Sequence, residues 1–195
     1  MRETISCVID RIKTISPLDV DMPQIPRILL ERLREIDPTA TFSGLPRIIS
    51  SSGAIYFGKT GSASEVEQYV GEAESVRAMN KVAPGVAPHV FACGVTETGA
   101  PYFISEYKDI SPLNSNTKAA NELAKRLATE MHAETHPDGF GFPIPTYCGP
   151  TRLTNGMFKT WHECYASQIG DLLHQLGQKV NYLSLCSKGE IIKNE

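Results

Sequence analysis

A single lysine stands near the end of a short run of β-branched and aromatic residues, AIYFGKTG at 54–61. Residues of this kind favour β-strands, and the ammonium of Lys59 is costly to bury beside them unless it has a partner. The chain that follows offers one. Residues 64–80 repeat apolar side chains at helical spacing, and Glu72 lies in the middle of this predicted helix, close to its buried face. The residues predicted to share that face are Val66, Tyr69, Val70, Ala73 and Val76.

A carboxylate beside Lys59 would hold the ammonium in one place, as a site that meets phosphate charge requires. Glu67 and Glu74 lie more toward the other side of the predicted helix, so Glu72 is the expected partner. The alternative is an exposed lysine at the end of an edge strand and a solvated glutamate on an acidic helix. Spacing alone favours this alternative, because a lysine and a glutamate so arranged form a weakly specific motif.

The order of the other predicted elements narrows the fold. A helix is predicted over 25–37, where Pro26 suits the first turn, and strands with tight turns are predicted over 37–62. Residues 89–107 have the pattern of a hairpin that turns at 96–99.

A change of composition at 106–116, which is polar and contains proline, is the predicted boundary between two lobes. These are residues 1–110 and 111–195. The second lobe begins with a clear predicted helix over 117–132. The stripe predicted to be buried on that helix consists of Ala120, Leu123, Ala124, Leu127 and Met131.

The rest of the second lobe is less regular in sequence. Residues 136–150 are rich in glycine and proline and are predicted to form an irregular connector. A further helix is predicted from Phe158 to about Leu183, and the tail at 184–195 has no clear periodicity and is predicted to be frayed.

Composition limits the partners. The net charge is −3 and no basic run occurs, which argues against nucleic acid. No segment could span a bilayer, and the first 16 residues lack the apolar core of a signal peptide. The five cysteines are scattered and form no CxxC pair, as is typical of free thiols in a reducing compartment. We therefore expect a cytoplasmic protein that binds neither nucleic acid nor membrane.

Strands, a helix, two strands, a polar hinge and then helices is the element order of a protein-kinase-like fold. We therefore expect an α+β protein with a small antiparallel-sheet lobe of about five strands and an incomplete helical lobe. In that fold a lysine on the third strand contacts the α and β phosphates of the nucleotide, and a glutamate on the next helix orients it. Lys59 and Glu72 fit these two positions.

Five segments between about Phe42 and Leu176 match those of one family of small-molecule kinases. They are YFGKTG, VGEAESVRAM, PYFISEY, ELAKRLATEMH and the most specific one, FGFPIPTYCGPTRLTNGMFKTWHECYASQI. The last of these is carried by Phe140, Gly141, Phe142, Thr146, Cys148, Gly149, Asn155 and Trp161. On these segments the chain resembles the fructosamine/ketosamine-3-kinase family, which includes protein-ribulosamine 3-kinases.

The resemblance implies an ATP-dependent kinase, with Mg²⁺, that phosphorylates the 3-hydroxyl of ribulosamine or fructosamine adducts in protein deglycation. The substrate would be a glycated protein or a small ketosamine. The residues implied to bind ATP are Lys59, Glu72, Glu106, Tyr107 and Gly44, with backbone groups near Glu106 and Tyr107 at the adenine edge.

The chain also departs from the family pattern. The glycine loop is degenerate, FSGLPRIISSSG, and Ser105 stands where the family usually has methionine or a similar residue. Gln168-Ile169 replaces an Arg-Leu pair, and no His-Gly-Asp with a downstream Asn occurs. The residues that would serve as base and hold magnesium are therefore not among these 195. The alternative hypothesis is a catalytically incomplete remnant or isoform that acts as a binding module.

Three further features have simpler explanations. His132 and His136 are four residues apart, a spacing at which two histidines on a helix can bind zinc. No third ligand is evident, however, and Pro137 ends any helix there. No residue adjacent to Cys148 in the sequence would make its thiol reactive, so a structural role is expected. Trp161 could stack on a sugar, but a core tryptophan of an amphipathic helix is the expected outcome.

Overall fold

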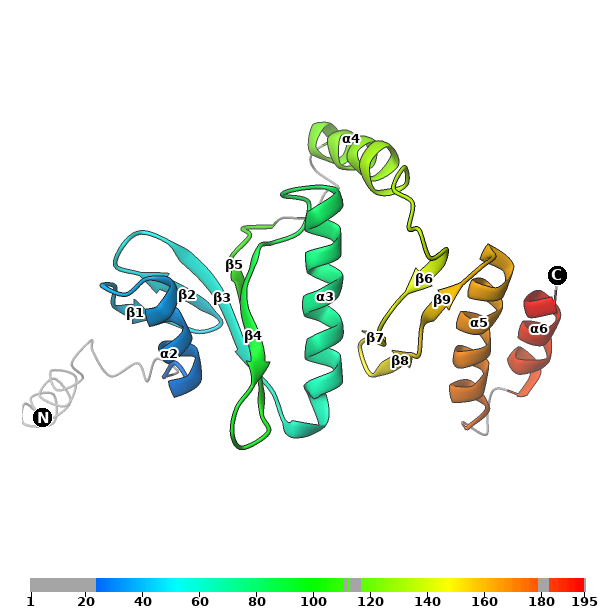
Figure 1. Cartoon of the computed structure of the whole chain (residues 1–195), viewed down its shortest axis with the longest axis horizontal. Coiled ribbons are helices and arrows are strands. Elements are labelled where there is room, and N and C mark those ends of the chain that lie inside the picture. Colours follow the sequence, from blue (N-terminus) through cyan, green and yellow to red (C-terminus); the bar gives the residue numbers. More distant parts are fainter. Residues whose placement is uncertain (1–23, 111, 113–116, 179–182, 195) are drawn as a thin grey trace, which may run out of the picture.

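The computed structural model describes residues 24–110, 112, 117–178 and 183–194. Figure 1 shows the elements in chain order. The first group is α2 (Arg27–Ile36), β1 (Phe42–Ser43), β2 (Arg47–Ser50), β3 (Ile55–Thr60), the 3₁₀ turn η1 (Ala63–Glu65), α3 (Val66–Val82), β4 (Val90–Val95) and β5 (Pro101–Glu106). The second group is α4 (Thr117–Arg126), the π-helical turn η3 (Leu127–Met131), β6 (Phe140–Phe142), β7 (Thr146–Cys148), β8 (Thr151–Leu153), β9 (Gly156–Phe158), α5 (Trp161–Gly177) and α6 (Leu183–Asn194).

A five-stranded antiparallel sheet organises the first group, with the strand order β1-β2-β3-β5-β4. β3 lies in its centre, where it pairs with β2 on one side and β5 on the other, and Lys59 stands opposite Phe103. The predicted α+β fold, with residues 54–59 and 101–106 in one sheet, is therefore confirmed.

Side-chain alternation gives the sheet two different faces. α2 covers one face, and its buried core consists of Leu29, Leu33, Ile48, Tyr56, Tyr102 and Ile104. α3 covers the other face, where Tyr69, Ala73, Val90 and Phe103 are buried and Phe57, Val76 and Cys93 pack against them. Since Lys59 is two residues after Phe57, it belongs to the face that α3 covers.

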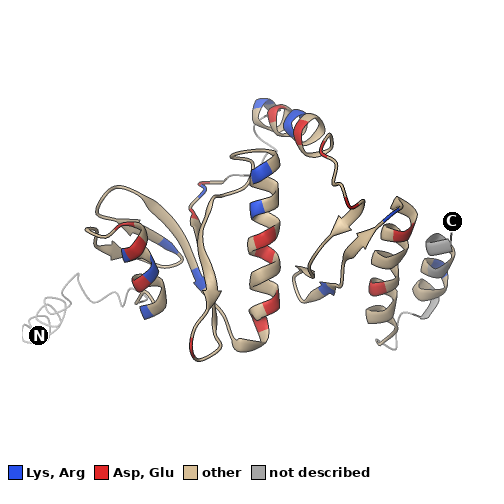
Figure 2. Cartoon of the chain, viewed as in Figure 1, with Lys and Arg blue, Asp and Glu red and all other residues tan. Residues whose placement is uncertain are grey.

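The short turn η1 connects β3 to the start of α3. Ser62 and Glu65 form a capping box, in which the Ser62 amide donates to Glu65 Oε2 at 2.7 Å. Figure 2 shows acidic residues along the first part of α3 and basic residues at its C-terminal end, the order that suits the helix dipole. The predicted buried face was wrong at Val70, which is 44% exposed because it lies beyond the edge of the stripe set by Tyr69 and Ala73.

The predicted connector at 136–150 was wrong, because it contributes to two small sheets. β6 pairs with β9, and β7 pairs with β8, in strands of three residues each. Such short strands show no alternation of their own, and their partners lie later in the chain. The following helix begins at Trp161, because residues 156–158 form β9 and Thr160 caps α5.

Three further expectations about the second group were also wrong. None of the five residues of the predicted stripe on 117–131 is buried, and Leu127 is 38% exposed, because apolar spacing predicts burial only where another element covers it. Trp161 is 59% exposed rather than a core residue. The tail forms α6, which packs on α5 with Gly189 against Leu173.

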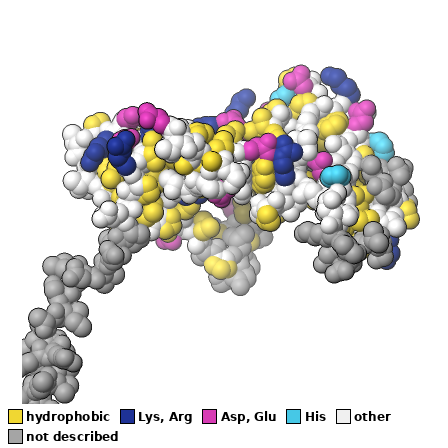
Figure 3. Space-filling model, turned by 90° about the horizontal axis from the view of Figure 1, so that it is seen from below, with side chains coloured by type: hydrophobic (Ala, Val, Ile, Leu, Met, Phe, Trp, Pro, Cys, Tyr) yellow, Lys and Arg dark blue, Asp and Glu magenta, His cyan; other side chains and the backbone are white. Residues whose placement is uncertain are grey.

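The surface of the described residues shows no charge segregation on the face in Figure 3, where basic and acidic side chains are interspersed with hydrophobic ones. None of the helices in the described ranges is long and apolar enough to cross a membrane.

The core between α2 and the sheet should dominate stability. Leu33→Ala removes a fully buried side chain and should lower the free energy of unfolding by about 2–5 kcal/mol. Leu127→Ala, at an exposed position, is the matched control and should stay within about 0.5 kcal/mol. Urea unfolding of both variants measures the difference, and equal losses would contradict the core described above.

Candidate functional site

Lys59 and Glu72 meet across the gap between the sheet and α3. The Lys59 Nζ donates to Glu72 Oε2 at 2.6 Å, and the two side chains are 30% and 37% exposed. The ammonium also lies 4.5 Å from the centre of the Tyr69 ring, a cation–π contact that further limits where it can point. The expected ion pair is formed, and the alternative of a lone lysine on an edge strand is excluded because β3 is central.

A cavity of about 310 Å³ adjoins this pair at the end of β5. Glu72 lines it together with Glu106 and Tyr107 of the segment that leaves the sheet. The other lining residues are Phe57, Val76, Pro88, Phe103, Ser105, Lys108 and Ile110. The structure therefore brings three of the five predicted nucleotide residues to one cavity, with Lys59 joined to it through Glu72.

The amides of the hinge are already occupied. The Glu106 N–H donates to His89 O at 2.8 Å, and the Tyr107 N–H donates to Ile55 O at 3.3 Å. The backbone of these two residues can therefore offer only carbonyl oxygens to a bound base. A hydrogen bond from Lys108, with an Nζ–Oε1 distance of 2.7 Å, holds the pKa of the Glu106 carboxyl below its usual value.

Gly44 lies apart from this cavity and is not among the residues that line it. It occupies the turn between β1 and β2 with φ of +85°, where an added Cβ would lie 2.6 Å from Arg47 O. A single glycine with a positive φ does not make the tight loop that wraps a phosphate chain. The structure explains Gly44 by the turn that it makes.

Arg47 was missed by the sequence analysis. Its guanidinium lies 5.3 Å from the centre of the Tyr107 ring, beside the hinge. Its place beside the site follows from strand pairing, because Arg47 is exposed on β2 and pairs with Phe57, which lines the cavity. The sequence pattern does not give that pairing. Arg47 is a further cation at the edge of the site, besides Lys59 and Lys108.

Metal coordination is not provided by the described residues. They contain no group of three or more His, Cys, Asp or Glu side chains that could hold a metal ion. Glu72, the carboxylate nearest the lysine, is already paired with it. The described residues therefore offer no preformed cluster of ligands for Mg²⁺, an ion that proteins usually hold with one or two carboxylates together with substrate phosphates.

The far side of α3 carries a second polar cluster. Arg152 of β8 binds Glu67 with two nitrogens, at 2.5 Å from Nε and 2.9 Å from Nη2, and the Tyr147 hydroxyl donates to the same carboxylate. These bonds lower the pKa of Glu67 to about 2, with the Arg152 hydrogen bonds as the main cause. Glu74, the other glutamate that was not expected to pair with Lys59, forms an ion pair with Arg77.

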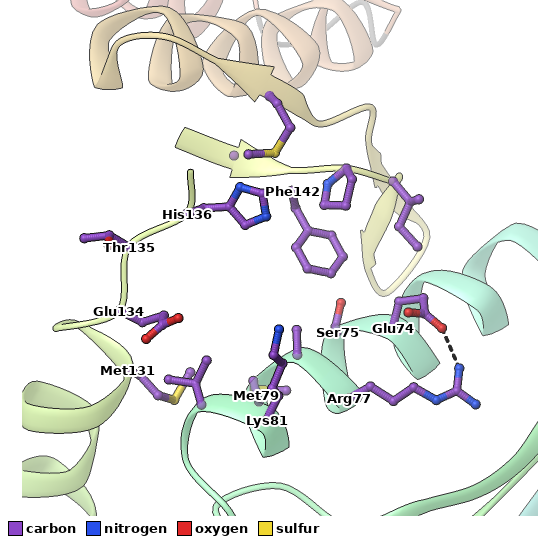
Figure 4. Close-up of a pocket in the computed structure, with 16 residues that line it drawn as sticks. Glu74, Ser75, Arg77, Met79, Lys81, Met131, Glu134, Thr135, His136 and Phe142 are labelled. Carbon is purple, nitrogen blue, oxygen red and sulfur yellow. Dashed lines mark hydrogen bonds and ion pairs between the residues drawn. The ribbon is translucent and has the colours of Figure 1, made fainter. Parts of the chain in front are cut away.

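A larger cavity, of about 780 Å³, lies between the C-terminal half of α3 and the paired strands β6 and β9 (Figure 4). Met79, Met131 and Phe142 form apolar walls, and His136 and Glu134 reach it from the segment after η3. None of the residues that line it also lines the cavity beside Glu72. This cavity is therefore separate from the Lys59 site.

Comparison with known proteins agrees with this architecture. The family model described as fructosamine kinase matches residues 45–194. The match extends over most of the chain, so the protein belongs to the fructosamine kinase family. A search of curated proteins gave no match.

A solved structure shows the same fold. It is the crystal structure named "Putative fructosamine-3-kinase" from Haemophilus somnus 129PT, with a TM-score of 0.62 and 18% sequence identity. The match covers 85% of this chain and 59% of that chain. The fold is thus protein-kinase-like, and this chain spans somewhat more than half of that protein's length.

The Glu67 cluster makes stability depend on pH. Its folded pKa is about 2, below the ordinary value of 4.5, so the ionised carboxylate stabilises the folded state. That contribution is complete above about pH 4.5 and is lost as the pH falls toward 2. The difference in urea midpoint between wild type and Glu67→Gln should therefore be constant from pH 7 to 5 and shrink from pH 4.5 downward. A difference that stays constant to pH 3 would contradict the assignment.

Proposed function

We propose that the chain provides the ATP-binding part of a ketosamine kinase, an enzyme that phosphorylates the 3-hydroxyl of fructosamine or ribulosamine adducts. The observation that carries this proposal is the ion pair of Lys59 with Glu72 beside the hinge cavity. A lysine held by a carboxylate on the following helix is the device by which kinases of this fold contact the nucleotide phosphates. Membership of the fructosamine kinase family supports the choice of acceptor.

The described side chains suggest how ATP would lie. The Lys59 ammonium would meet the α and β phosphates, with Glu72 fixing its position. The adenine would enter the cavity lined by Phe57 and Phe103, and its amino group would donate to a carbonyl of Glu106 or Tyr107. No role is proposed for Gly44 beyond its turn.

Transfer of the γ-phosphoryl group needs more than this. The acceptor hydroxyl must lose its proton to a base as the new P–O bond forms and ADP leaves. Asp138 and Asp171 are the late aspartates of the chain, and neither follows His-Gly. Asp171 accepts hydrogen bonds from Thr154, at 2.6 Å from its amide, and so has a structural role. Because the described residues contain no group of three or more metal-ligating side chains, a binding module without turnover is the second candidate function for these 195 residues.

The setting that we propose is cytoplasmic, where ATP and glycated proteins or small ketosamines would be the partners in protein deglycation. The described cysteines, Cys93, Cys148, Cys164 and Cys186, are free. Free thiols are typical of proteins from a reducing compartment.

ATP binding tests the site directly. Lys59→Ala should weaken ATP affinity roughly 10- to 100-fold, because a hydrogen bond to a charged group contributes about 1.5–3 kcal/mol. Lys125→Ala, which removes an exposed lysine from α4, is the matched control and should leave affinity unchanged. Calorimetric titration of the folded proteins measures both. Equal affinities for wild type and Lys59→Ala would rule out the nucleotide site.

Turnover tests whether these 195 residues suffice for the chemistry. Residues 1–195 supplied with ATP, magnesium and a fructosamine or ribulosamine should give little or no 3-phosphate product, because the residues that match the family's base and metal ligands are not among them. Product is measured by phosphorus NMR or mass spectrometry. Turnover at ordinary enzymatic rates that Lys59→Ala abolishes would show that other groups of this chain perform the chemistry.

A further inference from the structure

We propose that Arg152 and Tyr147 are positioning residues, which hold α3 at the height and rotation at which Glu72 reaches Lys59. The proposal rests on the proposed function, since it concerns how the nucleotide lysine is kept oriented. Three observations carry it: the contacts at Glu67, the backbone approach at Gly71 and the small buried surface of α3.

The contacts at Glu67 act on the helix from the side opposite the sheet. Glu67 precedes Glu72 by five residues, which places the two side chains about 140° apart around the helix axis. Glu72 reaches the sheet through Lys59, while Glu67 receives two nitrogens of Arg152 and the hydroxyl of Tyr147. A bidentate arginine fixes both direction and distance, so it limits rotation as well as sliding of the helix.

The hairpin formed by β7 and β8, which carries Tyr147 and Arg152, also approaches the backbone of α3 near the same place. An added Cβ at Gly71 would lie 2.5 Å from Pro145 O, closer than non-bonded atoms can approach. Gln68 donates to Gly149 O at 3.3 Å, in the turn between β7 and β8. Figure 1 shows α3 between the sheet and these two strands. The hairpin therefore limits how far α3 can move on this side.

The sheet holds α3 from one side only. On that side the helix buries Tyr69 and Ala73, and Val76 packs against them. Gly71, the third buried residue of α3, lies against Pro145 on the other side. Ala73 contributes only a methyl group, so the apolar contact with the sheet comes mainly from Tyr69 and Val76. The position of Glu72 therefore also depends on what holds the opposite face.

The hairpin is itself tied to α5, so it can serve as an anchor. Asp171 accepts a hydrogen bond from the Thr154 amide at 2.6 Å, and Gln175 donates to Arg152 O at 2.5 Å. Arg152 also donates to Thr154 Oγ1 at 3.1 Å. These bonds fix the backbone from which the Arg152 side chain extends.

The test uses two readouts on the whole chain. Amide hydrogen exchange of 66–76 reports the hold on α3 without any ligand, and ATP affinity with and without Glu72→Gln reports the orientation of Lys59. Arg152→Met should raise exchange across 66–76 about tenfold and leave α2 unchanged. Glu72→Gln should weaken ATP binding about tenfold in the wild-type background and less than twofold in the Arg152→Met background.

Matched variants separate positioning from general stability. Arg32→Met breaks an ion pair with Glu35 within α2, in which one guanidinium nitrogen donates to both carboxylate oxygens, and should change neither readout. Gly71→Ala should reproduce the effect of Arg152→Met, whereas Gly177→Ala, where nothing lies within 4 Å of the added Cβ, should not. Exchanging the charges in Glu67→Arg/Arg152→Glu should restore much of the affinity that either single change loses. Tyr147→Phe, which removes only a hydroxyl, serves if Arg152→Met does not fold.

Unchanged exchange of α3 in both Arg152→Met and Tyr147→Phe would overturn the proposal. So would a Glu72→Gln effect of equal size in the two backgrounds. If Lys59→Ala and Glu72→Gln leave ATP affinity unchanged in wild type, the proposed nucleotide site fails instead. The exchange of α3 then decides by itself whether the hairpin holds the helix.

Discussion

The distance between α3 and the central strand β3 determines whether Lys59 has a partner. Strand pairing fixes the lysine, since β2 and β5 hold β3 from both sides and alternation turns residue 59 toward α3. The glutamate is fixed only as well as its helix is. A displacement of α3 by about one residue, 1.5 Å along its axis, would lengthen a contact that is now 2.6 Å. The site thus requires a sheet in register and a helix held in place.

The need to hold α3 in place explains the structure of residues 140–158. Its residues build the two small sheets that lie against α3 and α5. At Gly141, with φ of +129°, an added Cβ would lie 1.9 Å from Gly156 O, so the close pairing of β6 and β9 excludes a side chain. Asn155 has a φ of 57°, which asparagine tolerates, and its amide donates to Ile144 O and Thr146 Oγ1. Gly141 and Asn155, which carry part of the family resemblance, thus shape the small sheets that pack against α3 and α5.

Local patterns predicted the central strand and its helix because both elements are long enough to show in the sequence. The run of β-branched and aromatic residues located β3, and helical spacing placed Glu72 rather than Glu67 toward the lysine. The pattern could not show the strands at 140–158, since three residues carry no period and their partners lie elsewhere in the chain. Nor could apolar character decide burial: Trp161 is exposed, although it stacks with Tyr165 and meets Phe140 edge-on. Burial depends on which element comes to cover a side chain, and spacing within one segment does not contain that information.

A crystal structure of the chain with bound ADP tests the central claim most directly. The account predicts the Lys59 Nζ at about 3 Å from an oxygen of the α or β phosphate, still in contact with Glu72. It also predicts the adenine in the cavity beside the Glu106 carbonyl. ADP bound at another place, with Lys59 and Glu72 apart and pointing to solvent, would contradict it.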